Sequence, residues 1–220
     1  FVADRGFVID NLSHGGAGSS AAGSAGGGGF YIVGTPSTTF EIVNTVIADN
    51  EADDGDSGSP VGGGGGGLFL QGAVGAVVHG TMAGNRLGNF SLDGQGVVII
   101  AGGSPSVVEF DFTIFADHTS GADAALHVQP GNSAALNMGL FANNTTDTGG
   151  GGTISGLNSM ISDVSAGFAA PGAPEYDYHI LQTSPAVDAA VGSSEALDVD
   201  GQARSLPDIG ADELDAAVFA

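Results

Sequence analysis

Short apolar segments recur along the chain, and most of them end in Asn or Asp. Seven-residue blocks begin at residues 5, 44, 79, 111 and 137, and a degenerate copy occupies residues 158–164. The fourth position of every block is apolar: Val8, Ile47, Met82, Ile114, Leu140 and Ile161. Recurrence of this kind is typical of stacked repeats that bury a core only together. We therefore expect these six side chains to form one shared spine.

A second element precedes several blocks: a glycine run followed by a short apolar strand. Residues 26–29 and 62–67 are glycine, and the apolar runs 30–33 and 68–70 follow them, with weaker copies at 97–100 and 124–128. Helical periodicity is scarce. The pattern predicts an all-β fold, a right-handed parallel β-helix (solenoid) of about six rungs with a C-terminal capping segment.

The domain organisation follows from a change in amino-acid composition near Phe168. Residues 1–167 are predicted to form the rungs, with long Gly-rich loops at 14–29 and 51–67. Residues 168–220 carry several prolines and many of the acids, and are predicted to cover the last rung, because an open end exposes apolar side chains and unpaired strands. The seventh block position holds Asn11, Asn50, Asn85, Asp117 and Asn143. We expect these residues to turn through the left-handed region and to form a hydrogen-bonded ladder.

The charge balance limits the partners. Three arginines face 25 acidic residues, there is no lysine, and the formal net charge is −22. Nucleic acid is excluded, because binding it needs clustered cations, and anionic membranes are repelled. No apolar stretch is long enough to span a membrane. Divalent cations, high salt or neutral partners fit better, and the start at Phe1 predicts a processed product or an excised piece.

The tail carries three ordered motifs: SPAVDAA at 184–190, DVDGQAR at 198–204 and PDIGADE at 207–213. Together with the repeats, they resemble the choice-of-anchor Q domain family of bacterial exported and cell-surface proteins. The resemblance implies a β-helix and an extracellular or cell-surface location, but no established reaction. Two positions depart from the family pattern: Ala190 stands where Gly is usual, and Asp212 where an aromatic residue is usual.

Catalytic candidates are few. Proton abstraction beside a uronate needs a cationic group, and the three arginines lie far apart in the rung order. A polysaccharide hydrolase needs only two carboxylates, so that chemistry stays open. The sharpest polar pair is His79 and Asp111, predicted in one column on neighbouring rungs roughly 4.8 Å apart. The alternative is that this pair is a structural step of the polar ladder.

Calcium is the cofactor that the acidic turns favour. Carboxylates at Asp53, Asp54 and Asp56, and at Asp198 and Asp200, lie on tight Gly-containing turns, as a hard cation prefers. The alternative is a solvated acidic turn. Arg204 is expected to form an internal ion-pair cluster with Asp198, Asp200 and Asp208.

These observations lead to three functional hypotheses. The first is a non-enzymatic extracellular structural or adhesive protein, a surface filament subunit that associates with itself through the N-terminal rung at residues 1–11. The second is a binding module for a neutral glycan or a surface partner, using the loops 14–29 and 51–67. The third is a glycan-active hydrolase, which is the reaction class we expect if the chain is an enzyme.

Overall fold

The computed structural model describes residues 1–15, 26–35, 37, 39–53, 64–88 and 93–214. A nine-stranded sheet contains β1 (Val2–Ile9), β4 (Thr39–Ala48), β8 (Val74–Ala83), β11 (Val107–Asp111), β12 (Ile114–Ala116), β14 (Ser133–Asn137), β15 (Leu140–Ala142), β17 (Thr153–Ser155) and β18 (Ile161–Asp163). A six-stranded sheet contains β3 (Phe30–Val33), β6 (Gly64–Gly65), β7 (Leu68–Gln71), β10 (Asp93–Ile100), β13 (Ala124–Val128) and β16 (Thr148–Gly150).

Two smaller sheets and one helical turn complete the described elements. The three-stranded sheet contains β2 (Leu12–His14), β5 (Glu51–Asp53) and β9 (Arg86–Leu87), and the two-stranded sheet contains β19 (Phe168–Ala170) and β20 (Asp177–Ile180). A 3₁₀ turn, η1, spans Leu157–Ser159. No helix within the described residues is long and apolar enough to cross a membrane.

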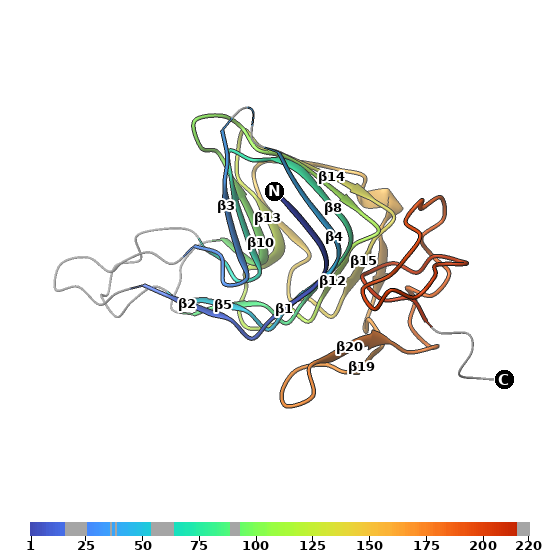
Figure 1. The fold of residues 1–220 in the computed structure, drawn as a ribbon. Coiled ribbons are helices and arrows are strands. Elements are labelled where there is room, and N and C mark those ends of the chain that lie inside the picture. The colour runs from blue at the N-terminus through green and yellow to red at the C-terminus, as the bar shows by residue number, and fades with distance from the viewer. Residues whose placement is uncertain (16–25, 36, 38, 54–63, 89–92, 215–220) are drawn as a thin grey trace.

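The nine-, six- and three-stranded sheets are parallel, and each strand pairs with its counterpart from the next repeat. In the nine-stranded sheet β1 pairs with β4 and β4 with β8, so that Val8, Ile47 and Met82 lie side by side. Figure 1 looks along this stack, and the sheets curl around a common interior. The prediction of an all-β fold with parallel strands is therefore confirmed.

The core lies between the nine-stranded and the six-stranded sheets. Ile42, Val77 and Phe110 occupy one register row of the first sheet and are at most 1% exposed. Leu70 and Ile99 face them from the second sheet and are fully buried. Each layer of the stack thus contributes apolar side chains to one continuous interior, and none of these layers buries its apolar face alone.

The predicted spine is wrong beyond Met82. Met82 pairs with Phe115, not with Ile114, whereas Ile114 pairs with Thr81 and Leu140. The blocks that we placed at 111–117 and 137–143 are therefore shifted by one residue. Because side chains alternate between the two faces of a strand, this shift moves Ile114 and Leu140 from the inner to the outer face of the sheet.

Two columns of left-handed residues bend each turn of the chain. One column contains Arg5, Asn44, His79, Phe112 and Met138, and the other contains Asp10, Asp49, Gly84, Asp117 and Asn143, all with φ between 45° and 59°. The prediction is thus right for Asp117 and Asn143. It is wrong for the other three candidates, because the left-handed residue there is the one before Asn11, Asn50 or Asn85.

The polar ladder is formed by the residues that follow the second column. Asn11 donates from Nδ2 to Asn50 Oδ1 over 2.9 Å, and Asn50 donates in the same way to Asn85 Oδ1 over 3.0 Å. Two layers further, Asn144 Oδ1 accepts from the backbone and ring nitrogens of His118 at 3.1 and 3.0 Å. Asn143 Nδ2 also donates to Asp117 Oδ1 over 2.7 Å. The hydrogen-bonded ladder is therefore confirmed for Asn11, Asn50 and Asn85, and for the separate pair of Asp117 and Asn143.

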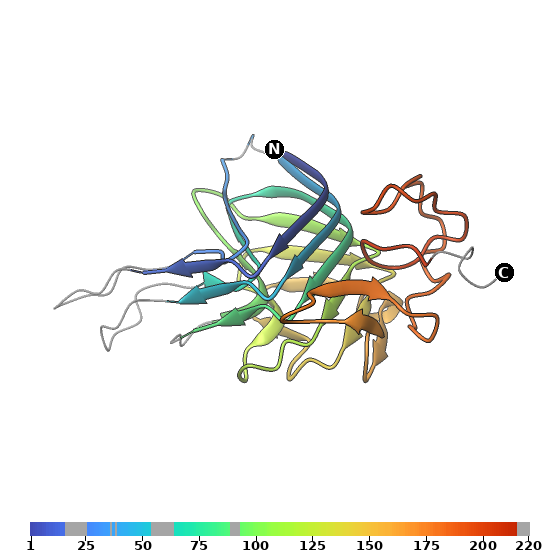
Figure 2. The same ribbon diagram turned by 60° about the horizontal axis from the view of Figure 1, so that its bottom comes forward.

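The C-terminal segment, residues 168–214, lies against the side of the nine-stranded sheet. Both Figure 1 and Figure 2 place it beside the curled stack. It shares a second core with the outward side chains of the stack: Val46, Ala48, Ala83, Phe112, Ile114, Ala116, Leu140 and Ala142. The expectation that it covers the last rung is wrong for the described residues. The outward apolar rows created by the one-residue shift explain why it lies on the side.

One glycine allows this close approach. Gly210 has φ +98, and a Cβ built on it would lie 2.6 Å from Ile114 Cδ1 and 3.0 Å from Thr81 Oγ1. Its amide donates to Phe112 O over 2.8 Å. A side chain at position 210 would displace the end of the Ile114 side chain and strain a backbone conformation that other residues rarely adopt, so glycine suits this contact.

Candidate functional site

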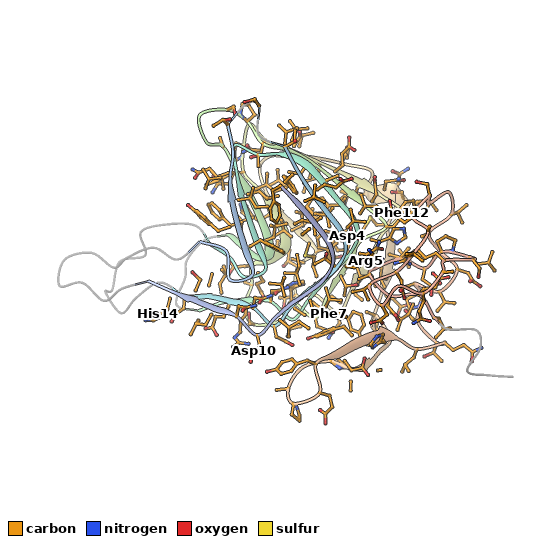
Figure 3. The ribbon with its side chains drawn as sticks, in the orientation of Figure 1. Asp4, Arg5, Phe7, Asp10, His14 and Phe112 are labelled. Atoms are coloured by element: carbon orange, nitrogen blue, oxygen red, sulfur yellow. The ribbon has the colours of Figure 1, made fainter. Side chains whose placement is uncertain are left out.

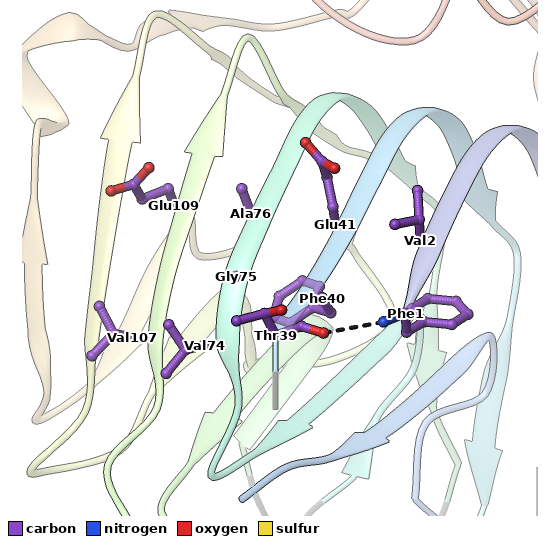
Figure 4. A pocket seen from close by; sticks show the side chains of 10 residues that line it. All are labelled: Phe1, Val2, Thr39, Phe40, Glu41, Val74, Gly75, Ala76, Val107 and Glu109. Atoms are coloured by element: carbon purple, nitrogen blue, oxygen red, sulfur yellow. Dashed lines mark hydrogen bonds between the residues drawn. The ribbon is translucent and has the colours of Figure 1, made fainter. Parts of the chain in front are cut away.

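An open groove lies on the outer face of the nine-stranded sheet, before the first left-handed column. It encloses about 440 Å³ and runs across β1, β4, β8 and β11. Figure 4 shows its two rows of side chains, with Glu41 and Glu109 in one row and Thr39, Val74 and Val107 in the other. The α-amino group of Phe1 donates to Thr39 O over 3.2 Å at the end of the groove.

The groove combines an apolar floor with two carboxylates. Glu41 pairs in register with Ala76, and Ala76 with Glu109, so the two acids stand two strands apart, roughly 9–10 Å along the stack. No arginine is among the described residues that line the groove. Carboxylate oxygens accept hydrogen bonds from hydroxyl groups, so this surface suits a neutral polyhydroxyl ligand better than an anion.

His79 and Asp111 do not form the predicted pair. Asp111 pairs in register with Val78 and Asn137, whereas His79 is a left-handed corner residue that is 0% exposed. The His79 ring stacks on Phe112 at 4.9 Å between centroids and contacts the C-terminal segment through Gly210 O and Ser193 Oγ, at 3.2 and 2.6 Å. The pairing is therefore wrong, for the same one-residue reason, and His79 has a packing role.

The left-handed corners are the points where the C-terminal segment attaches. Arg204 donates to Asn44 Oδ1 over 3.1 Å, and the amide of Ala211 donates to Thr81 Oγ1 over 3.0 Å. Phe112 points from the sheet toward this segment (Figure 3). Farther along, the Tyr178 hydroxyl donates a hydrogen bond to Asp49 Oδ2.

Arg204 is buried, but its partners differ from the predicted ones. Its guanidinium contacts Glu213 Oε2 at 3.3 Å and donates to the carbonyl oxygens of Asp208, Gly210, Ala211 and Asp212. The Asp208 carboxylate instead accepts from two backbone amides, those of Asp188 and Leu214, at 2.5 and 2.7 Å. Arg204 therefore orders the 208–213 turn mainly through carbonyl groups.

Burial dominates the electrostatics of this interface. It lowers the pKa of His79 to about 3, with the nearby Arg204 charge acting in the same direction. It also raises the pKa of Asp208 and Glu213, and that of Asp212 to about 6. For His179, burial lowers the pKa, but hydrogen bonds to Asp177 and Asp200 outweigh it and raise the pKa to about 9.

The predicted calcium residues are dispersed. Asp53 lies in β5 with its Oδ2 2.9 Å from His14 Nδ1, and Asp54 and Asp56 lie outside the described residues. Asp198 is 0% exposed, and its two oxygens accept from the amides of Asp200, Gln202 and Glu213. Asp200 lies against His179, with Oδ2 2.7 Å from Nε2. Calcium binding stays a prediction.

The sequence reading missed the groove and the attachment surface. Both depend on the register between repeats, and the alanine column at 48, 83, 116 and 142 marks the correct register. Comparisons with known proteins add no assignment. No protein-family model matches the chain, and neither the curated proteins nor the solved structures gave a match. The resemblance to the choice-of-anchor Q domain family stays a prediction.

Proposed function

We propose that the chain is a right-handed parallel β-helix of about six rungs, similar to the choice-of-anchor Q domain proteins, and acts outside the cell as a structural or adhesive protein. Parallel pairing between successive repeats supports this architecture. The tail motifs support the family proposal, because they contact one another. The backbone amide of Asp188 donates to Asp208 Oδ1, and the backbone amide of Glu213 donates to Asp198 Oδ2.

One observation carries the functional part: the C-terminal segment occupies the side of the stack and leaves its last layer open. Among the described residues, β16, β17 and β18 each pair with a strand on one side only. At the first layer, β4 is the one partner of β1 in the described ranges, and Phe7 is 52% exposed. Unpaired parallel edges at both ends of a stack are templates for further strands, and head-to-tail contacts of this kind build filaments.

The proposed filament subunit is tested by measuring mass against concentration. We expect the 220-residue chain to associate, more strongly in high salt, because its net charge of −22 opposes contact between copies at low salt. Light scattering and electron microscopy should show linear assemblies. Phe7→Asp should reduce the assembled fraction at least tenfold, since it places a charge beside the first edge.

The matched control is Val191→Asp, which also adds a carboxylate at an exposed apolar position, but in the C-terminal segment. This control should assemble like the parent chain. A monomer at every protein and salt concentration would contradict the filament proposal, and so would equal losses in the two variants.

A second candidate, binding of a neutral glycan, is favoured by the groove. Its apolar floor and the two carboxylates Glu41 and Glu109 suit the faces and hydroxyl groups of a sugar chain. A glycan array should give signals with neutral oligosaccharides that fall when both residues are changed to Gln. Silence across neutral sugars would remove this candidate. Hydrolysis of a bound sugar that stops in the same variant would favour the hydrolase hypothesis instead.

A further inference from the structure

Three side chains that can bind a metal meet in the C-terminal segment, although they are far apart in the sequence. His179 belongs to β20, Asp200 to the turn that follows Asp198, and Asp212 to the turn that Arg204 orders. One ligand atom from each of the three lies within 4.8 Å of the other two. They form the one such group of three or more among the described residues.

Asp212 shows that this group is more than a patch of surface acids. The residue is 4% exposed, and its Oδ2 accepts from the amide of Ile180 over 2.7 Å. Its other oxygen, Oδ1, is buried and has no hydrogen-bond partner. A buried carboxylate oxygen without a partner is costly, and a bound cation is one of the few groups that removes the cost.

His179 is held in an orientation that suits metal binding. Its Nδ1 lies 2.5 Å from Asp177 Oδ1, and the same oxygen accepts from the His179 backbone amide over 3.1 Å. The opposite ring nitrogen, Nε2, is then directed at Asp200 Oδ2, 2.7 Å away. A carboxylate that fixes one ring nitrogen while the other binds the ion is the usual outer-shell arrangement of protein zinc sites.

We propose that His179, Asp200 and Asp212 form a binding site for a divalent transition-metal ion of the zinc type. Imidazole nitrogen combined with carboxylate oxygen suits such an ion, whereas calcium prefers a shell of oxygen atoms alone. Ligand atoms around one zinc ion lie roughly 3.4 Å apart at bond lengths of about 2.1 Å. The side chains therefore need only small movements, and the ion takes the place of the proton between Nε2 and Asp200.

The site would tie together three parts of the C-terminal segment. It links β20 to the 198–201 turn and to the 208–213 turn, which carries the contacts of Gly210 and Ala211 with the sheet. The side chains of His179 and Asp200 are 46% and 36% exposed. The ion therefore faces solvent, and its fourth position is open to water or to a ligand atom from a partner.

The experiment uses the 220-residue chain, stripped with a chelator and titrated with zinc chloride by calorimetry. We expect one ion per chain, and loss of binding by at least a hundredfold in His179→Gln and in Asp212→Asn. Asp177→Asn should weaken binding about 10- to 100-fold, because Asp177 orients the ring without touching the ion. Cobalt substitution should give visible absorption bands that disappear in His179→Gln.

The matched control is Glu175→Gln, which changes an exposed acid of the same segment that has no hydrogen-bond partner among the residues the structure describes. It should bind zinc like the parent chain. Circular dichroism checks that Asp212→Asn folds. If that variant does not fold, His179→Gln still tests the site, because it replaces a half-exposed ring and should leave the fold intact. Failure to bind zinc above the level of the buffer, unchanged binding in His179→Gln, or preference for calcium over zinc would each overturn the proposal.

Discussion

The two halves of strands β4 and β8 differ sharply, although they belong to the same sheet. Before the left-handed corners Asn44 and His79, exposed residues alternate with buried ones in β4, and the outer face forms the open groove. After the corners every residue of both strands is buried, and the outer face carries small or apolar side chains under the C-terminal segment. The outer face of each strand is thus exposed to solvent before the corner and covered by the C-terminal segment after it.

This difference shows that the left-handed corner determines whether the outer face of a strand is exposed or buried. A left-handed residue interrupts the alternation of the strand, so the apolar run that follows it can be buried on both sides. The alanines at positions 48, 83, 116 and 142 keep the outer surface flat, and the corner residues themselves bind the C-terminal segment. Within the part of the chain that the structure describes, none of these attachments reaches the groove side.

The largest expected effect comes from removing Arg204. Arg204→Ala leaves Glu213 and several buried carbonyl groups without their partner, so we expect a loss of about 3–5 kcal/mol in the free energy of unfolding. Denaturant unfolding measures it. Arg86→Ala, which breaks the half-exposed pair with Glu51, should cost less than about 1 kcal/mol. Equal losses of unfolding free energy in the two variants would contradict the claim that the buried Arg204 holds the C-terminal segment on the sheet.

The next effect depends on pH and concerns His79. Its folded pKa of about 3 lies below the ordinary value of 6.5, so only the unfolded chain takes up this proton between the two values. Stability from this group is complete above pH 6.5 and is lost as the pH falls toward 3, on the order of 3–5 kcal/mol. His79→Asn keeps a residue that tolerates the left-handed corner and should remove this part of the pH dependence. Identical profiles of unfolding free energy against pH for the parent chain and His79→Asn would refute this role of His79.

A smaller effect compares two alanines of β8 directly. Ala83 lies under the C-terminal segment and is 0% exposed, whereas Ala76 lies in the open groove. Ala83→Leu should cost about 1–3 kcal/mol, because the added atoms have no space. Ala76→Leu should change the free energy of unfolding by no more than about 0.5 kcal/mol. Similar values for both would show that the two halves are equally accessible.

Local patterns predicted the strands and the ladder, but not the layer-to-layer register. In the sequence the polar ends of the blocks set the alignment, and Asp111 and Asp117 resemble the Asn residues at 44 and 50. The alanine column would have aligned them correctly. A shift of one residue exchanges the inner and outer faces, so it hid the outward apolar rows and with them the docking site of the C-terminal segment.

The candidate sites were less predictable for the same physical reason. His179 and Asp212 are separated by 33 positions and meet only because β19 and β20 pair and the 208–213 turn folds back on Arg204. No spacing within a strand or helix encodes such a meeting. Asp198 and Asp200 share one turn, but the burial of Asp198 by backbone amides becomes visible only in the structure.

The most direct test of the side-on C-terminal segment is a cysteine cross-link, since the chain has no cysteine of its own. Ala211 N lies 3.0 Å from Thr81 Oγ1, so the double variant Thr81→Cys, Ala211→Cys should form a disulfide within one chain on mild oxidation. The comparison pair, Leu157→Cys with Ala211→Cys, joins the same residue to the last layer. Peptide mass spectrometry should find the first cross-link and not the second, and the reverse result would contradict the account.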